Sequence, residues 1–285
     1  MTLPHIQTFS LSIITLLAPS ILLAEETILS DTFSDGVLLD AELFDGARKQ
    51  GFWEFPNTDL IKTTEVGGKL NIAYTFEEDG FGNVWGGHSS EQTAAWDFFS
   101  QEIILSVRGL SIDAFPTAVR SYYGFTPKSS SSYAQDDGIA LLVQGDGTVE
   151  LLAHIDSGGP RNFGNITFIS EYVPNGISGF DLALDGTNGS GVDYTVTLYH
   201  DGDTISRTGQ ITGMTVDNWS DVKDGDGGLG HSRLMTRIQT QSREDFTYQI
   251  SEISIKRVDI PEPLSIVAIL GILSTVVVIR RKHAV

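Results

Sequence analysis

Two glutamates of this sequence could take part in acid–base chemistry on a glycan. Glycosidic bonds are hydrolysed by two carboxyl groups about 5 to 9 Å apart, which on one strand means a spacing of two or four residues. Glu150 and Glu252 lie in strand-like segments, but neither has an acidic residue two or four positions further on. A polysaccharide lyase would use a constellation of His, Tyr and Arg, for which the candidates are His154, Tyr199, His200 and Arg237. These spacings favour a non-catalytic protein and leave a glycan-cleaving enzyme as the alternative.

An acidic, glycine-rich segment at residues 221–228 predicts a calcium site. Asp221, Asp224 and Asp226 supply carboxylates, and the glycines between them allow backbone carbonyls to approach a cation. The segment departs from an EF-hand loop, because Lys223 interrupts it and the glutamate of the twelfth loop position is missing. A solvated acidic turn is the alternative. The absence of cysteine excludes thiol catalysis and cysteine-based zinc sites.

Two of the four tryptophans are candidates for sugar binding, because an exposed indole ring can stack on a pyranose. Trp85 stands in the glycine-rich segment 82–88, where a large apolar side chain has few local neighbours. Trp219 stands beside the acidic segment, and with its aspartates it could form a calcium-assisted sugar site. Core packing is the alternative for both residues.

The charge of the chain excludes one class of partner. It contains 37 acidic and 18 basic residues, for a net charge of −19. Nucleic acid would be repelled rather than bound, because binding to phosphates depends on basic residues that release counterions. A strongly negative net charge keeps protein molecules soluble because they repel one another, which is consistent with a protein outside the cell.

Short alternating segments dominate residues 25–260, which are enough for one domain with a sizeable core. In the segment 69–76, Leu70, Ile72 and Tyr74 share one face, as in a half-buried strand. Segments 138–144 and 149–155 flank a Gly-Asp-Gly turn, and segments 193–200 and 204–211 flank an Asp-Gly-Asp turn, so each pair predicts a hairpin. The fold class is therefore all-β, an antiparallel sandwich.

The last alternating segment, residues 246–258, changes phase in its middle. Phe246, Tyr248 and Ile250 share one parity, whereas Ile253 and Ile255 share the other. We expect a β-bulge near residues 251 and 252 to return both sets to the core.

The last 25 residues have the features of a membrane segment. The apolar run 264–279 carries no charge, would form about 24 Å of helix, and ends at Arg280, Arg281 and Lys282. This basic cluster places the tail in the cytoplasm and the bulk of the chain outside. A buried core helix is the alternative for a run of this length. Pro261, Glu262 and Pro263 precede the run and predict a stiff break before it.

The combination of the Pro-Glu-Pro motif, the apolar run and the basic stop resembles the PEP-CTERM sorting signal of Gram-negative bacteria. The resemblance covers residues 261–285. It implies that exosortase, a membrane transpeptidase, recognises the tail and cuts near the motif. The precursor would then be anchored in the inner membrane, and the mature protein would reach the cell surface or the extracellular matrix.

The first 24 residues predict a secretory signal peptide with cleavage after Ala24, because an apolar stretch precedes the acidic Glu25 and Glu26. The stretch lacks a basic n-region, and Leu22 occupies a position where a small residue is usual. Retention of this segment as an anchor is the alternative.

Three segments of the central domain resemble concanavalin A-like, laminin-G-type jelly rolls. They are the opening 28–36, the strand segment 137–143 and the terminal segment 250–255. The resemblance implies two curved, packed sheets whose first and last strands pair, often with a glycan or calcium site. A different jelly roll, such as a carbohydrate-binding module, would give the same pattern.

Together these features predict an exported, exosortase-sorted protein of the envelope or matrix whose sandwich binds or scaffolds extracellular polysaccharide without catalysis. Two alternatives remain at this stage: a structural matrix protein without a specific ligand, and a glycan-cleaving hydrolase or lyase.

Overall fold

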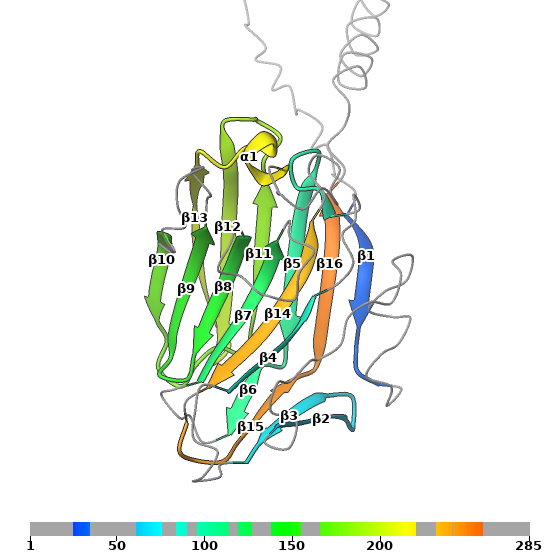
Figure 1. The fold of residues 1–285 in the computed structure, drawn as a ribbon, viewed down its shortest axis with the longest axis vertical. Helices are drawn as coiled ribbons and strands as arrows, with labels where there is room; N and C mark the ends of the chain where they lie inside the picture. Colours follow the sequence, from blue (N-terminus) through cyan, green and yellow to red (C-terminus); the bar gives the residue numbers. More distant parts are fainter. Residues whose placement is uncertain are drawn as a thin grey trace, which may run out of the picture.

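The described residues form two stacked six-stranded β-sheets and a smaller third sheet (Figure 1). The computed structural model describes residues 25–34, 61–75, 84–89, 96–113, 119–126, 138–154, 166–220, 232–240 and 242–258. Every strand pair among the described residues is antiparallel. The predicted all-β antiparallel sandwich is therefore confirmed.

One six-stranded sheet, sheet A, contains both the first and the last described strand. Its order is β1 (Glu25–Asp31), β16 (Glu252–Val258), β5 (Glu102–Arg108), β11 (Gly179–Asp185), β12 (Gly191–His200) and β13 (Asp203–Thr212). β1 pairs with β16 along its length, with Glu25 opposite Val258 and Asp31 opposite Ile253. The first and last described strands pair, as the jelly-roll resemblance implied.

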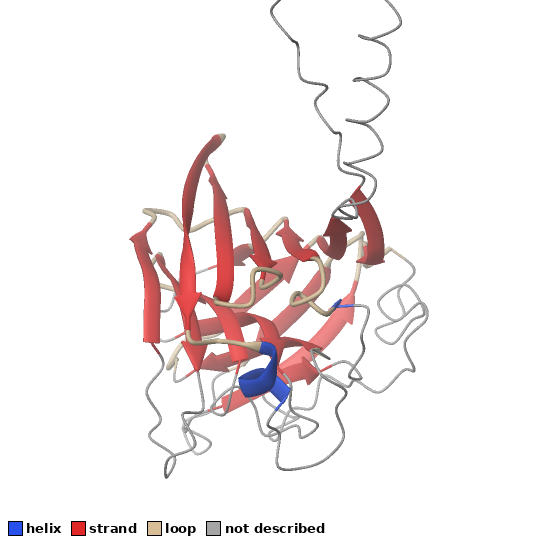
Figure 2. Ribbon diagram, turned by 90° about the horizontal axis from the view of Figure 1, so that it is seen from above, coloured by secondary structure: helices blue, strands red, loops and turns tan. Residues whose placement is uncertain are grey.

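The other six-stranded sheet, sheet B, lies against sheet A. Its order is β10 (Ile166–Tyr172), β9 (Thr148–His154), β8 (Gly138–Gln144), β7 (Val119–Thr126), β14 (Arg233–Thr240) and β4 (Val84–Ser89). The two layers are seen from above in Figure 2, with the short helix α1 (Val216–Ser220) at one end. Both predicted hairpins are present, β8 with β9 and β12 with β13, and Gly147 and Gly202 take the positive φ that their turns require.

The third sheet, sheet C, corrects the prediction of a bulge in the last alternating segment. Its order is β2 (Ile61–Glu65), β3 (Leu70–Tyr74), β15 (Phe246–Ile250) and β6 (Ser111–Asp113). The phase change falls where the chain leaves sheet C after β15 and enters sheet A as β16. The neighbouring pair β5 and β6 changes sheets at the same level, where the amide of Ser251 donates to the carbonyl of Arg108 at 2.9 Å. Two adjacent strands thus bend together.

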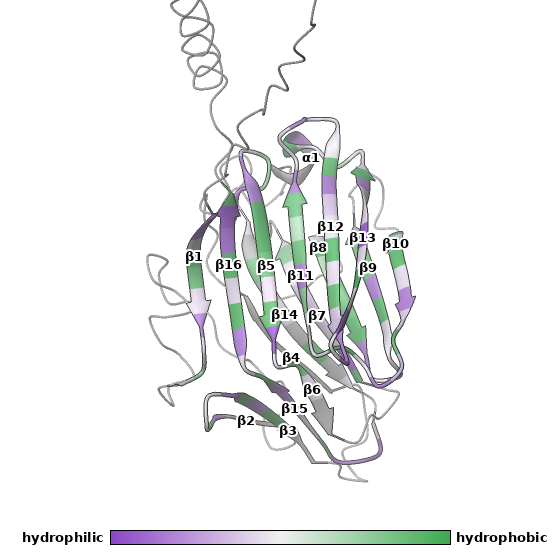
Figure 3. Cartoon of the chain, turned by 180° about the vertical axis from the view of Figure 1, so that it is seen from behind, coloured by the Kyte–Doolittle hydropathy of each residue, from purple (hydrophilic) through white to green (hydrophobic). Residues whose placement is uncertain are grey.

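The core lies between the inner faces of the sheets. Phe180 and Leu105 of sheet A and Phe125 and Leu141 of sheet B are all fully buried. Along the sheet A strands, hydrophobic and hydrophilic bands alternate, as Figure 3 shows most clearly for β12. This alternation is what a sheet with one dry and one solvated face requires.

A pair of tyrosine hydroxyls is enclosed in this core. The hydroxyls of Tyr123 and Tyr248 form a hydrogen bond with each other, and the Tyr248 hydroxyl donates to Ser121 Oγ at 3.0 Å. Burial raises the pKa of both phenols well above the ordinary value. Both side chains therefore stay neutral, and their hydrogen bonds satisfy polar groups that would otherwise be costly to bury.

Both terminal segments lie outside the described residues. Ala24, the predicted signal cleavage site, lies in the N-terminal segment that is not described. The C-terminal segment that is not described contains the residues of the PEP-CTERM resemblance: Pro261, Glu262, Pro263, Arg280, Arg281 and Lys282. Within the part of the chain that is described, no helix combines the length and apolar character needed to cross a membrane.

Candidate functional site

The outer face of sheet B carries polar residues at its centre. In β7, Val119, Tyr123 and Phe125 point into the core, and they alternate with Arg120 and Tyr122 on the outer face. Arg120 is exposed and Tyr122 is half-buried. Because directly paired residues of antiparallel strands share a face, the register identifies the neighbours of these residues on the other strands.

One row of paired positions crosses all six strands of this face. Trp85 of β4 pairs with Gln239, Gln239 pairs with Arg120, and Arg120 pairs with Gln144. The last pair of the β8–β9 hairpin is Val143 with Val149, so Gln144 and Thr148 follow it on the two sides of the turn, and Thr148 pairs with Tyr172. We call this set the first row: Trp85, Gln239, Arg120, Gln144, Thr148 and Tyr172. It has an aromatic residue at each end and polar residues between them.

A second row runs beside the first, two residues further along each strand. Its pairs join Gly87 to Arg237, Arg237 to Tyr122, Tyr122 to Leu142, Leu142 to Glu150 and Glu150 to Ser170. The second row is therefore Gly87, Arg237, Tyr122, Leu142, Glu150 and Ser170. Each row crosses five inter-strand spacings of about 4.8 Å, or about 24 Å in all. That length accommodates several sugar units of an extended polysaccharide.

Glu150 is the acidic residue of these two rows. Its Oε2 accepts a hydrogen bond from Gln144 Nε2 at 3.2 Å, which links the second row to the first. Leu142 and Leu152 beside it are buried on this outer face, at 5% and 7% exposed. A half-buried carboxyl group next to apolar side chains and held by an amide is suited to proton transfer to or from a bound sugar.

The exposed edge of the first row ends in a large aromatic ring. Tyr172 is 68% exposed, and its ring lies beside Gly147 in the β8–β9 turn, where a Cβ at Gly147 would be 3.5 Å from Tyr172 Cε2. The amide of Val173 donates to the carbonyl of Gly147 at 2.9 Å and fixes this edge of β10. An exposed tyrosine held in this way offers a flat apolar surface to a sugar ring.

The two tryptophans predicted to bind sugar have different positions. Trp219 is 2% exposed; its Nε1 donates to Ser232 Oγ at 3.2 Å, and its ring packs edge-on against Phe98 at 5.0 Å between centroids. The prediction that Trp219 stacks on a sugar is therefore wrong, because α1 holds the indole ring in the core. Trp85 lies on strand β4 rather than in a loop, and its position falls at the end of the first row.

The other candidate residues are not brought into one cluster. Glu150 lies in sheet B and Glu252 in sheet A, so the two do not form a catalytic pair. The lyase candidates divide in the same way, with His154 and Arg237 in sheet B and Tyr199 and His200 in sheet A. Asp221, Asp224 and Asp226 lie outside the described residues. Among the residues that are described, no group of three or more acidic or histidine side chains is placed to hold a metal ion.

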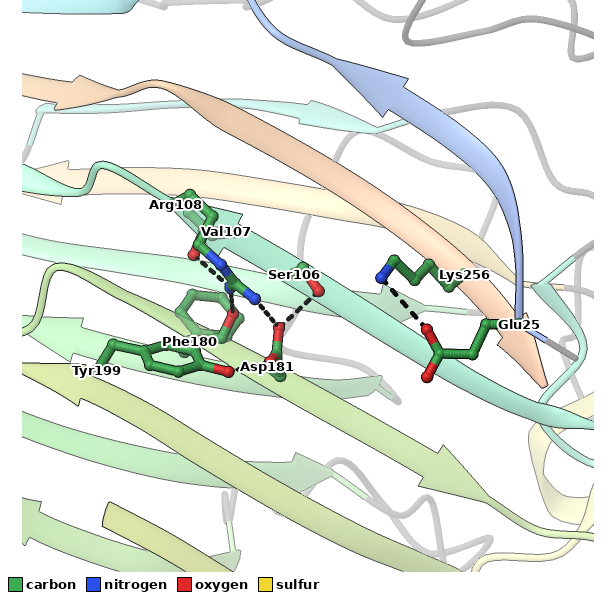
Figure 4. Close-up of polar contacts among 8 residues, drawn as sticks. All are labelled: Glu25, Ser106, Val107, Arg108, Phe180, Asp181, Tyr199 and Lys256. Carbon is green, nitrogen blue, oxygen red and sulfur yellow. Dashed lines mark hydrogen bonds and ion pairs between the residues drawn. The ribbon is translucent and has the colours of Figure 1, made fainter. Parts of the chain in front are cut away.

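A second polar cluster lies on the outer face of sheet A (Figure 4). Asp181 Oδ1 accepts hydrogen bonds from Ser106 Oγ and from Arg108 Nη2, both at 2.6 Å, and Asp181 Oδ2 accepts one from the Tyr199 hydroxyl at 2.5 Å. The Arg108 guanidinium lies over the Tyr199 ring, 4.6 Å from its centroid. Burial opposes ionisation of Asp181, but these donors outweigh it and hold its pKa below the ordinary value. Because both oxygens are engaged, the cluster stabilises the sheet and offers no free base.

Replacing Asp181 with alanine should lower the free energy of unfolding by about 2 kcal/mol at neutral pH, because three donors lose their acceptor. The stabilisation from a lowered pKa is present above the unfolded carboxyl's pKa of about 3.9 and is lost as the pH falls through the folded value. Urea unfolding at neutral and acidic pH should therefore show the wild type and the variant converging in acid. The exposed Asp203→Ala is the matched control and should change little. A difference independent of pH would contradict this account.

Sequence comparison gives no family for this chain: no protein-family model matches it, and neither does any curated protein. Solved structures do share its fold. An endo-1,3-β-glucanase from Streptomyces sioyaensis is 12% identical with a TM-score of 0.53, and the match covers 83% of this chain and 97% of that one. A protein of unknown function from Shewanella oneidensis is 15% identical with a TM-score of 0.50, covering 85% and 90% of the two chains. The concanavalin A-like jelly-roll fold is thereby confirmed.

The comparison also corrects the predicted function. The interpretation as a non-catalytic module that binds or scaffolds polysaccharide rested on the lack of an acidic pair at strand spacing. The fold is nevertheless matched over nearly the whole length of a structure described as an endoglucanase. The comparison therefore overturns the non-catalytic interpretation as the main prediction, and the glycan-cleaving alternative fits it better.

Proposed function

We propose that this chain is a glycan-cleaving enzyme that holds a polysaccharide across the outer face of sheet B. The observation that carries the proposal is the first row, in which every strand contributes one polar or aromatic position to a line across the sheet. A line of this kind, which runs from one edge strand of sheet B to the other, suits a long chain that passes over the site rather than a chain end. The enzyme would therefore cleave within the polysaccharide.

Glu150 is the proposed proton donor to the glycosidic oxygen. It lies in the second row, so a sugar on the first row would pass directly beside it. Protonating the leaving oxygen while the C–O bond breaks is the step that a carboxylic acid performs in glycoside hydrolysis. Water then bonds to the anomeric carbon and gives one proton to the Glu150 carboxylate, which restores the acid for the next reaction. Tyr122, opposite Leu142 in the same row, is close enough across the sheet to contact the same sugar.

The proposal is tested by incubating the full-length chain, purified in detergent, with soluble polysaccharides of different composition. Size-exclusion chromatography and an assay for new reducing ends would follow each reaction. We expect one class of polysaccharide to shorten rapidly, with products of intermediate size early in the reaction, as internal cleavage requires. If every polysaccharide in a panel of neutral and acidic glycans keeps its length, the proposed function is wrong.

We also propose that the chain is exported and that its tail is removed by exosortase, because the Pro-Glu-Pro motif, the apolar run and the basic stop occur together. Mass spectrometry of the protein isolated from its host should then show a mature form that begins after Ala24 and lacks the residues that follow Pro263. Recovery of the mature protein with residues 280–285 intact would contradict the proposal.

A further inference from the structure

We propose that the polysaccharide is anionic and that Arg120 binds its charged groups, each a uronate carboxylate or a sulfate ester. This inference rests on the proposed function, since it names the substrate class of the same site. It starts from two arginine positions on one face: Arg120 in the first row and Arg237 in the second. Arg120 pairs with Gln239 and Arg237 pairs with Tyr122, so the two positions are diagonal neighbours about 7 to 8 Å apart.

Arg120 differs from four other basic side chains of the described residues. Arg108, Arg207, Lys256 and Arg257 each form an ion pair with a nearby carboxylate: Asp181, Glu171, Glu25 and Glu26 respectively. Arg120 is exposed and forms no ion pair with any described residue, in a chain with twice as many acidic as basic residues. Its guanidinium is available to an anion from solution.

The neighbours of Arg120 are neutral amides. Gln144 pairs with it on β8 and Gln239 on β14, and the one acid of the two rows, Glu150, is already bonded by Gln144. A guanidinium binds carboxylate or sulfate through two parallel N–H···O bonds. A neutral glycan has no charged group to pair with this guanidinium.

The net charge of −19 does not prevent binding of an anion here. At physiological ionic strength the Debye length is about 8 Å, so acidic residues on the far side of the sandwich are largely screened from this face. Arg207 further neutralises Glu171 on β10, the edge strand of sheet B. The interaction at short range is then decided by Arg120 and position 237.

The test is equilibrium binding to the full-length Glu150→Gln variant, which should hold oligosaccharides without cleaving them. The probes are an oligogalacturonate, a sulfated galactan oligosaccharide and a neutral β-1,3-glucan oligosaccharide of matched length. We expect at least one anionic probe to bind about tenfold or more tightly than the neutral one, as a charge-assisted contact implies. Whether the uronate or the sulfate probe is preferred identifies the charged group.

The matched variants separate this contact from the overall charge. Arg120→Gln should weaken binding of the anionic probe about tenfold or more and leave the affinity for the neutral probe unchanged. Arg257→Gln removes the same charge from sheet A and should change neither affinity. Equal affinity for neutral and anionic probes, or an Arg120→Gln variant that binds the anionic probe normally, would overturn the inference.

The two proposals can fail separately. Cleavage of a neutral glucan without any preference for anionic probes would overturn the anionic substrate and leave the enzyme. Tight, Arg120-dependent binding of an anionic glycan that the wild-type chain never shortens would support this site and overturn the proposed activity.

Discussion

Replacing Glu150 with glutamine should slow glycan cleavage by about 10²-fold or more and leave binding of the glycan intact. A positioned acid or base contributes a factor of this size, and glutamine keeps the shape of the side chain while removing its titratable proton. The hydrogen bond from Gln144 reaches an oxygen that glutamine also has, so the local packing of the second row should be preserved. The loss should therefore appear in kcat, with KM little changed.

The control for this variant is Glu252→Gln. Glu252 is also a strand glutamate with partial exposure, but it lies on β16 in sheet A. The Glu252→Gln variant should cleave the same substrate at the wild-type rate. Equal rates for Glu150→Gln and the wild type would remove Glu150 from the chemistry.

A second large effect is expected at Gly124, in the middle of β7. A Cβ at this position would lie 1.9 Å from the carbonyl oxygen of Ile139 and 2.7 Å from the Cα of Ala140. Both are backbone atoms of β8 that no side-chain rotation can remove, so alanine must push β7 and β8 apart. Gly124→Ala should lower the free energy of unfolding by about 2 to 3 kcal/mol, although alanine is ordinarily the better strand residue.

Urea unfolding monitored by tryptophan fluorescence would measure this loss, because Trp96 and Trp219 are buried in the core. Gly138→Ala on β8 is the matched control: the nearest atom to its Cβ would be 3.0 Å away, so its cost should be much smaller. An unchanged unfolding midpoint for Gly124→Ala would contradict the close approach of the two strands.

The parts of the fold that could be predicted from the sequence are those set by local pattern. β3 follows the alternation of Leu70, Ile72 and Tyr74, all of which are buried. The β8–β9 and β12–β13 hairpins follow from turn glycines between alternating runs. In these cases the residues that decide the structure are neighbours in the chain.

β7 and β14 were missed because their inner faces are only partly apolar. In β7 the buried side includes Ser121, whose hydroxyl donates to the carbonyl of Val143 at 3.2 Å. In β14 the buried side alternates leucine and isoleucine with Thr236 and Thr240. Both strands alternate between buried and outward positions, but some of the buried positions are occupied by serine or threonine. A pattern of apolar residues alone therefore does not reveal the alternation.

The candidate site could not be predicted because it is made by register between distant strands. Trp85, Arg120 and Gln144 come from three separate strands, and only the pairing through Gln239 places them in one row. Spacing within a single strand does not contain that information. The sheet change after Ile250 is a similar case, because the partners of β15 and β16 decide it.

The most direct test of the site is a crystal structure of the Glu150→Gln variant bound to an oligosaccharide of the class that the wild type cleaves. The account predicts a sugar chain along the first row on the outer face of sheet B, in contact with Arg120 and with a glycosidic oxygen beside position 150. A sugar bound to the outer face of sheet A, or one that makes no contact with β7 and β9, would contradict it.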